Sequence, residues 1–279
     1  MNKFSFIQLA DPQFGLFAAS SGKTDEEIAS YAKRGLIVRK VEKFDGLEPE
    51  INLYNKAIER ANQLKPRFVV VCGDIINDID NEDQINEVKR ISKKLEDSID
   101  LHWVPGNHDV SPDHNTPEKK CIERYRQNFG PDYYTFSHGD IKFIVINSTV
   151  LTSPETVIEE ADKQMEFIEK EAMTANKCGK QKIILFSHHP LFINSPNESD
   201  NNWSIKKQYR SKLLKIASDH GITANFAGHW HKNNYAFGDG IEVVASGPVG
   251  YPFGEDPSGF RIVDIKGTEI QHAYHSLEL

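Results

Sequence analysis

Cysteine is scarce in this sequence, and its spacing argues against a disulfide framework. The chain contains three cysteines, Cys72, Cys121 and Cys178, which are odd in number and far apart. Small secreted domains that depend on disulfides carry a denser and usually even set of cysteines. We therefore expect free thiols with structural roles, in a reducing compartment.

Long apolar runs and an excess of positive charge are also missing. No apolar stretch approaches the roughly 20 residues of a membrane-spanning helix, and the first residues, MNKFSFIQLA, lack the features of a signal peptide. The formal net charge is −8, and Lys and Arg are scattered among Asp and Glu. No membrane and no nucleic-acid partner is expected, and the expected compartment is the cytoplasm.

Short runs rich in β-branched and aromatic residues predict buried strands. They cover residues 4–10, 67–73, 101–106, 141–148, 182–187, 222–228, 241–247 and 260–265. Amphipathic helical patterns separate the earlier runs, whereas the last runs follow one another directly. This order predicts an α/β fold with two facing mixed sheets and helices outside them. We expect one domain over residues 1–279, with an irregular insertion at about 17–49 that is either functional or mobile.

Polar residues with metal-ligating side chains stand directly after five of these predicted strands. Functional groups of sheet-based enzymes collect where strands stop, because the sheet holds the following loops in place. Carboxylates, amides and imidazoles without a thiol form a ligand set for divalent metal ions rather than for a structural zinc site. The five groups are Asp11 and Gln13; Gly73-Asp74; Gly106-Asn107-His108-Asp109; His188-His189-Pro190; and Gly228-His229-Trp230-His231.

The order D-x-Q, GD, GNHD, HHP and GHxH resembles the five motifs of the calcineurin-like metallophosphoesterases, whose first motif is D-x-H. The chain is also similar to a Ser/Thr protein phosphatase branch of that family, described as calcineurin-like phosphoesterase domain-containing. That similarity covers ADPQFG, CGDII, GNHD, HPLF, GHWH, SGPVGYPFGEDPSGFRIV and YHSLEL. The resemblance implies a four-layer αββα sandwich with a binuclear metal centre between the sheet ends.

The resemblance also implies a role for each motif residue. Asp74 would bridge two divalent metal ions, for which Mn, Fe, Zn and Mg are the candidates. His188 rather than His189 is taken as a ligand because the family's ligand stands two residues before the proline. The first ion would be completed by Asp11, Gln13 and His231, and the second by Asn107, His188 and His229.

Gln13 stands where the family has histidine. An amide oxygen is a harder and weaker donor than imidazole, so the first ion would bind less tightly, with Mn or Mg favoured over Zn. Alternatively, Gln13 only caps the turn and one metal ion suffices. The sequence leaves both interpretations open.

The implied reaction is hydrolysis of a phosphomonoester by a metal-bridging hydroxide. His108 would protonate the leaving oxygen, and Asp109 would orient His108 by holding its other ring nitrogen. The expected substrate is a phosphorylated protein or a small phosphoester. One alternative is a phosphodiesterase acting on cyclic nucleotides or nucleotide-linked esters. Another is a non-catalytic scaffold, although the presence of His108 argues against it.

Overall fold

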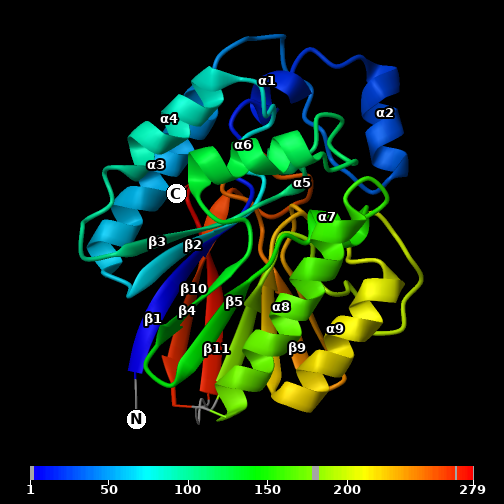
Figure 1. Ribbon diagram of the computed structural model, residues 1–279. Helices are drawn as coiled ribbons and strands as arrows, with labels where there is room; N and C mark the ends of the chain where they lie inside the picture. The colour runs from blue at the N-terminus through cyan, green and yellow to red at the C-terminus, as the bar shows by residue number, and fades with distance from the viewer. Residues whose placement is uncertain (1–2, 178–181, 268, 279) are drawn as a thin grey trace.

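Two mixed β-sheets pack face to face, and helices cover their outer faces (Figure 1). The computed structural model describes residues 3–177, 182–267 and 269–278. Cys72 and Cys121 are free and buried, as expected, whereas Cys178 lies outside the described residues. The predicted four-layer αββα sandwich is confirmed. No helix in the described ranges has the length and apolar character needed to cross a membrane.

The first sheet has the strand order β11-β10-β1-β2-β3 and the second β4-β5-β6-β7-β9-β8. Strands β1, β2 and β3 are parallel, as are β5, β6, β7 and β9, and the remaining strands join antiparallel. The bounds are β1 Lys3–Leu9, β2 Phe68–Cys72, β3 Asp100–Val104, β4 Tyr134–His138, β5 Ile141–Val145, β6 Lys182–Phe186, β7 Ile222–Ala227, β8 Asn234–Gly238, β9 Ile241–Ala245, β10 Gly259–Lys266 and β11 Glu269–Ser276.

Helices α3 and α4 lie over the first sheet and α8 and α9 over the second (Figure 1). The space between the sheets is filled by aromatic rings. Phe6 of β1 stacks on Phe68 at 4.8 Å and meets Phe186 of the opposite sheet edge to face at 5.6 Å. The helix bounds are α1 Leu16–Ser20, α2 Asp25–Lys33, α3 Glu48–Leu64, α4 Glu82–Ser92, α5 Asn107–Val110, α6 Lys119–Phe129, α7 Thr149–Thr152, α8 Ile158–Lys177 and α9 Lys207–His220.

The eight predicted strands are present, and the three strands that the apolar pattern missed are β4, β8 and β11. All three lie at a sheet edge. An edge strand has one neighbour instead of two and can expose one face, so it needs no continuous apolar run. Strand β11, for example, alternates between exposed and partly buried residues along its whole length.

The segment 17–49 is not irregular throughout, which corrects the sequence-based expectation. It contains most of α1 and all of α2. Helix α2 has no buried residue, so it lacks the apolar stripe that reveals most helices. Its sequence signal is a capping box, in which the Thr24 hydroxyl accepts from the backbone N–H of Glu27 while the Glu27 carboxylate accepts from that of Thr24.

His102 of β3 makes the fold sensitive to acid. Its ring stacks on Phe136 at 3.6 Å, and burial lowers its pKa to about 4. In the unfolded chain the imidazole takes a proton near pH 6.5, so the neutral folded form loses stability as the pH falls from about 6.5 towards 4. We expect His102→Phe to remove about 1–2 kcal/mol of the stability loss between about pH 7.5 and 5. Denaturant unfolding at both pH values measures this, and equal losses in the two proteins would contradict it.

Candidate metal centre

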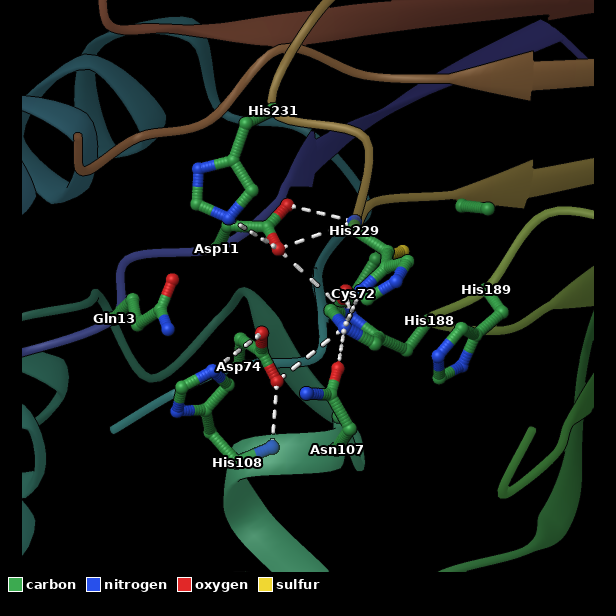
Figure 2. A network of polar contacts seen from close by, with 12 residues as sticks. Asp11, Gln13, Cys72, Asp74, Asn107, His108, His188, His189, His229 and His231 are labelled. Atoms are coloured by element: carbon green, nitrogen blue, oxygen red, sulfur yellow. Dashed lines mark hydrogen bonds and ion pairs between the residues drawn. The ribbon is translucent and has the colours of Figure 1, made fainter. Parts of the chain in front are cut away.

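The five predicted motifs meet at one end of the molecule, at the carboxyl ends of β1, β2, β3, β6 and β7. Asp11, Asp74, His188 and His229 point toward one another (Figure 2). The ring of His189 lies 4.1 Å from that of His229, but its Nδ1 faces the hydroxyl of Ser148 at 3.0 Å. Among the described residues, two groups of His, Asp, Glu or Cys side chains have potential ligand atoms within 4.8 Å of one another. One group is Asp74, His188 and His229, and the other is Asp11, Asp74 and His231.

Asp74 belongs to both groups. Its Oδ1 lies 3.3 Å from Nε2 of His188 and accepts a hydrogen bond from the backbone N–H of His108 at 3.0 Å. Asp11 Oδ1 lies 3.4 Å from Nε2 of His231. Both carboxylates are buried, and isolated buried carboxylates are costly unless cations balance them. This arrangement fits two neighbouring cations that share one carboxylate.

The three imidazoles of these groups are each held by a main-chain carbonyl. A carbonyl only accepts, so the nitrogen facing it carries a hydrogen, and the other nitrogen is the one available to a metal ion. The available nitrogens are therefore Nε2 of His188 and His231 and Nδ1 of His229. The carbonyl contacts are His188 Nδ1 to Cys72 at 2.9 Å, His231 Nδ1 to Tyr251 at 2.7 Å and His229 Nε2 to Asn202 at 2.9 Å.

The two predicted amide ligands also present oxygen. Asn107 donates through Nδ2 to the carbonyl of His114 at 2.8 Å, which leaves its Oδ1 3.0 Å from Nε2 of His188. Gln13 donates through Nε2 to Asn77 at 3.3 Å, and its Oε1 is buried without a hydrogen-bond partner. An orphaned buried acceptor costs about 1–3 kcal/mol. A cation beside Gln13 would remove that cost, so the donor set fits an oxygen-preferring metal ion.

Backbone strain concentrates at the same place. Among the described residues other than glycine, eight have positive φ. Such a conformation costs about 1–3 kcal/mol at a non-glycine residue and persists where the surrounding structure demands it. The turns that orient these side chains therefore lower the stability of the folded protein, and the geometry of the site is what they provide in exchange. The five that belong to the site are Asp11, Gln13, Asp74, His229 and His231.

Two glycines allow the strand ends to approach closely. Gly73 has a φ of +80°, and a Cβ there would overlap the imidazole of His188. Gly106 has an ordinary φ, but a Cβ there would overlap the backbone and carboxylate of Asp74. The glycines of the GD and GNHD motifs are therefore needed for contact between segments that are distant in the sequence.

His108 faces the centre, but its expected contact with Asp109 is absent. Its Nδ1 is 2.8 Å from the carbonyl of Asn77, and its Nε2 is 4.0 Å from Asp74 Oδ2. The Asp109 carboxylate instead accepts from the backbone N–H groups of Gly106, Ile75 and Ile76. Both residues lie in α5, where adjacent side chains do not face each other. The expectation is corrected accordingly, since a main-chain carbonyl orients His108.

His114 lies outside the five motifs, yet its ring stacks on His108 with centroids 3.9 Å apart. The residue has a φ of +63° in a turn held by the Asp113 carboxylate, which accepts from the N–H groups of Asn115 and Thr116. The asparagine- and aspartate-rich turn after GNHD was a signal for a compact loop. It could not show where the ring would lie.

The three histidines of the two ligand groups differ in pKa because the neighbouring charges differ. Burial disfavours every imidazolium here, but the carboxylates of Asp74 and Asp11 outweigh it at His188 and raise its pKa to about 9. At His229 and His231 burial prevails and lowers the pKa to about 3 and about 4, respectively. At neutral pH a cation bound at Asp74 and His188 would therefore displace a proton.

The chain belongs to the calcineurin-like phosphoesterase family, since residues 5–233 match the model of that family. It is 32% identical over 283 residues to the serine/threonine-protein phosphatase CPPED1 of Homo sapiens, and the alignment covers 99% of this chain and 84% of the relative. The Danio rerio protein of the same name is 31% identical over 281 residues, covering 99% and 85%. The expected family and the enzyme class of metal-dependent phosphoesterases are confirmed.

A solved structure supports the fold independently. It is a dimetal phosphatase from Danio rerio with a TM-score of 0.62 and 16% identity, and the match covers 98% of this chain and 99% of that one. At this identity the likeness concerns the fold alone.

Proposed function

We propose that this protein is a Ser/Thr protein phosphatase that hydrolyses phosphomonoesters at a binuclear metal centre. The observation that carries the proposal is Asp74, which is common to both ligand groups and lies 4.0 Å from Nε2 of His108. The name of the curated relatives supports the choice of substrate. The proposed ligands are Asp11, Gln13, Asp74, Asn107, His188, His229 and His231.

A bound pair of divalent cations would neutralise the phosphoryl oxygens and lower the pKa of an attacking water. The chain's own residues hold this geometry. Cys72, Asn202 and Tyr251 present their carbonyls to the three imidazoles, so each ring is held in one orientation with its other nitrogen toward the proposed metal ions. The Asp109 carboxylate ties the loop after β2 to the start of α5. Asp109 is therefore a positioning residue for Asp74 and His108.

His108 serves as the proton donor in this proposal. The leaving group of phosphoserine is an alkoxide, which needs a proton as the ester bond breaks. The Asn77 carbonyl fixes the hydrogen on Nδ1 of His108, and Nε2 then holds the proton that is transferred. The orientation of Nε2 toward Asp74 places this donor beside the centre.

A substrate panel tests the function. Protein reloaded separately with Mn, Mg, Zn and Fe is assayed with phosphoserine and phosphothreonine peptides, bis-p-nitrophenyl phosphate and cyclic nucleotides. We expect kcat/KM for phosphopeptides to exceed that for diesters by at least about tenfold. Preference for diesters would favour the phosphodiesterase alternative. Absence of hydrolysis with every metal would favour the scaffold.

Gln13 decides which metal the first site prefers. We expect Gln13→His to raise zinc affinity there by about tenfold, because imidazole suits zinc better than an amide oxygen does. Gln13→Leu, which offers no donor, is the matched control and should weaken that site. Calorimetric titration with zinc and manganese measures both. Identical titration curves for the three proteins would show that Gln13 binds no ion.

A further inference from the structure

A groove of about 550 Å³ opens beside the proposed metal centre. Asn107, His108 and His229 of the centre line it together with Trp203, Lys206 and Arg34. A volume of this size is typical of sites that hold a drug-sized ligand, so it accommodates more than the phosphoester itself. Arg34 is notable because it comes from the C-terminal end of α2, in the segment whose role the sequence left open.

The chain around Arg34 is anchored to the loop that follows β9. The backbone N–H of Ile37 donates to the carbonyl of Phe253 at 2.9 Å, and that of Arg39 donates to the hydroxyl of Tyr251 at 2.8 Å. The ammonium of Lys232 donates to the carbonyl of Gly35 at 2.6 Å. The residue after Arg34 is thus tied to the segment that carries His231.

A series of stacked groups links Arg34 to the centre. The ring of Phe253 lies 4.8 Å from that of His231, and the ring of Tyr31 lies parallel to Phe253 at 6.3 Å. The Arg34 guanidinium sits over Tyr31, 4.6 Å from the ring centroid. Aromatic stacking and the cation–π contact hold the guanidinium in place before any substrate arrives.

The charge of the groove is unusual for this protein. The chain has a net charge of −8, yet none of the described residues that line the groove is acidic. Lys206 is paired with Glu155 at 3.1 Å, whereas Arg34 forms no ion pair with any described residue. Arg34 therefore offers an exposed cation to whatever enters the groove. Arginine binds carboxylates in a bidentate manner and selects for them.

We propose that Arg34 is a specificity-determining residue that binds an acidic side chain next to the phosphorylated residue of a substrate. This inference rests on the proposed function, because it places a phosphopeptide in the groove beside the metal centre. The segment 17–49 is then a recognition element: α2 presents Arg34, and the stack on His231 sets its distance from the reaction site. The preferred substrates are phosphopeptides with Asp or Glu beside the phosphoserine.

The test compares Arg34→Ala with the wild type and with Lys33→Ala, which removes the same charge one residue earlier. The substrates are a phosphoserine peptide with flanking Glu, the same peptide with flanking Gln, and p-nitrophenyl phosphate. We expect Arg34→Ala to raise KM for the Glu peptide by about tenfold, which is the effect of losing one charge-assisted hydrogen bond. The other two substrates and Lys33→Ala should change by less than about twofold.

The possible results separate failure of this inference from failure of the proposed function. If Arg34→Ala leaves the Glu-to-Gln preference unchanged, or lowers kcat/KM equally for all substrates, the inference is wrong. If the wild type hydrolyses only diesters, the proposed function fails, and the peptides are then used as competitive inhibitors of diester hydrolysis. The same Arg34-dependent difference between the inhibition constants of the Glu and Gln peptides would support the inference, and equal constants would overturn it.

Discussion

Asp74→Asn is expected to lower turnover by about 1,000-fold or more, equivalent to about 4 kcal/mol of lost transition-state stabilisation. Asp74 is the residue that both ligand groups share, and its Oδ1 also accepts from the backbone of His108. An amide in its place removes the negative charge between the two sites and offers one oxygen instead of two. Both cations should therefore bind more weakly.

Metal analysis and steady-state kinetics measure this effect together. Asp78→Asn is the matched control, because Asp78 lies four residues further on, is exposed, and its side chain accepts a hydrogen bond from the backbone N–H of Asp80. We expect that variant to change turnover by less than about twofold. Wild-type metal content and turnover in Asp74→Asn would refute a shared carboxylate at the centre.

His108→Ala should lower turnover on phosphoserine peptides by about 100-fold or more, as loss of a general acid does. The loss should be smaller on p-nitrophenyl phosphate, because nitrophenolate leaves without needing a proton. Metal content should stay unchanged, since His108 belongs to neither ligand group. Equal losses on both substrates would assign His108 to another task.

The stacked ring of His114 provides a control for that experiment. His114→Phe keeps an aromatic ring over His108 and leaves the backbone carbonyl that binds Asn107. Its turnover should stay within about twofold of the wild type. A loss as large as that of His108→Ala would mean that the His114 imidazole itself takes part in proton transfer.

The buried strands and the ligand types were predictable because their signals are local, whereas the four-layer sandwich was implied by the family resemblance. Each buried strand is marked by its own apolar run, and the candidate ligands follow within a few residues, as Asp74 follows β2. Three of the edge strands, β4, β8 and β11, were missed because they lack such a run, as the alternating burial of β11 illustrates. Helix α2 was missed because capping rather than packing marks it.

The contacts within the site were less predictable. Asp109 was expected to hold the ring of its neighbour His108, but the helical geometry of α5 directs their side chains differently. His114 belongs to none of the five motifs, yet the turn folds its ring onto His108. Both errors arise where orientation, rather than residue type, decides the contact.

The amino-acid order specified which chemical groups stand at the strand ends, because a strand and the turn after it form from neighbouring residues. Folding specified how those groups face one another. The orientation of the His188 ring depends on the carbonyl of Cys72, which is 116 positions away. The position of the Arg34 guanidinium depends on the stacked rings of Tyr31, Phe253 and His231. Contacts of this kind are formed by the packing of the two sheets and their loops, so no stretch of neighbouring residues encodes them.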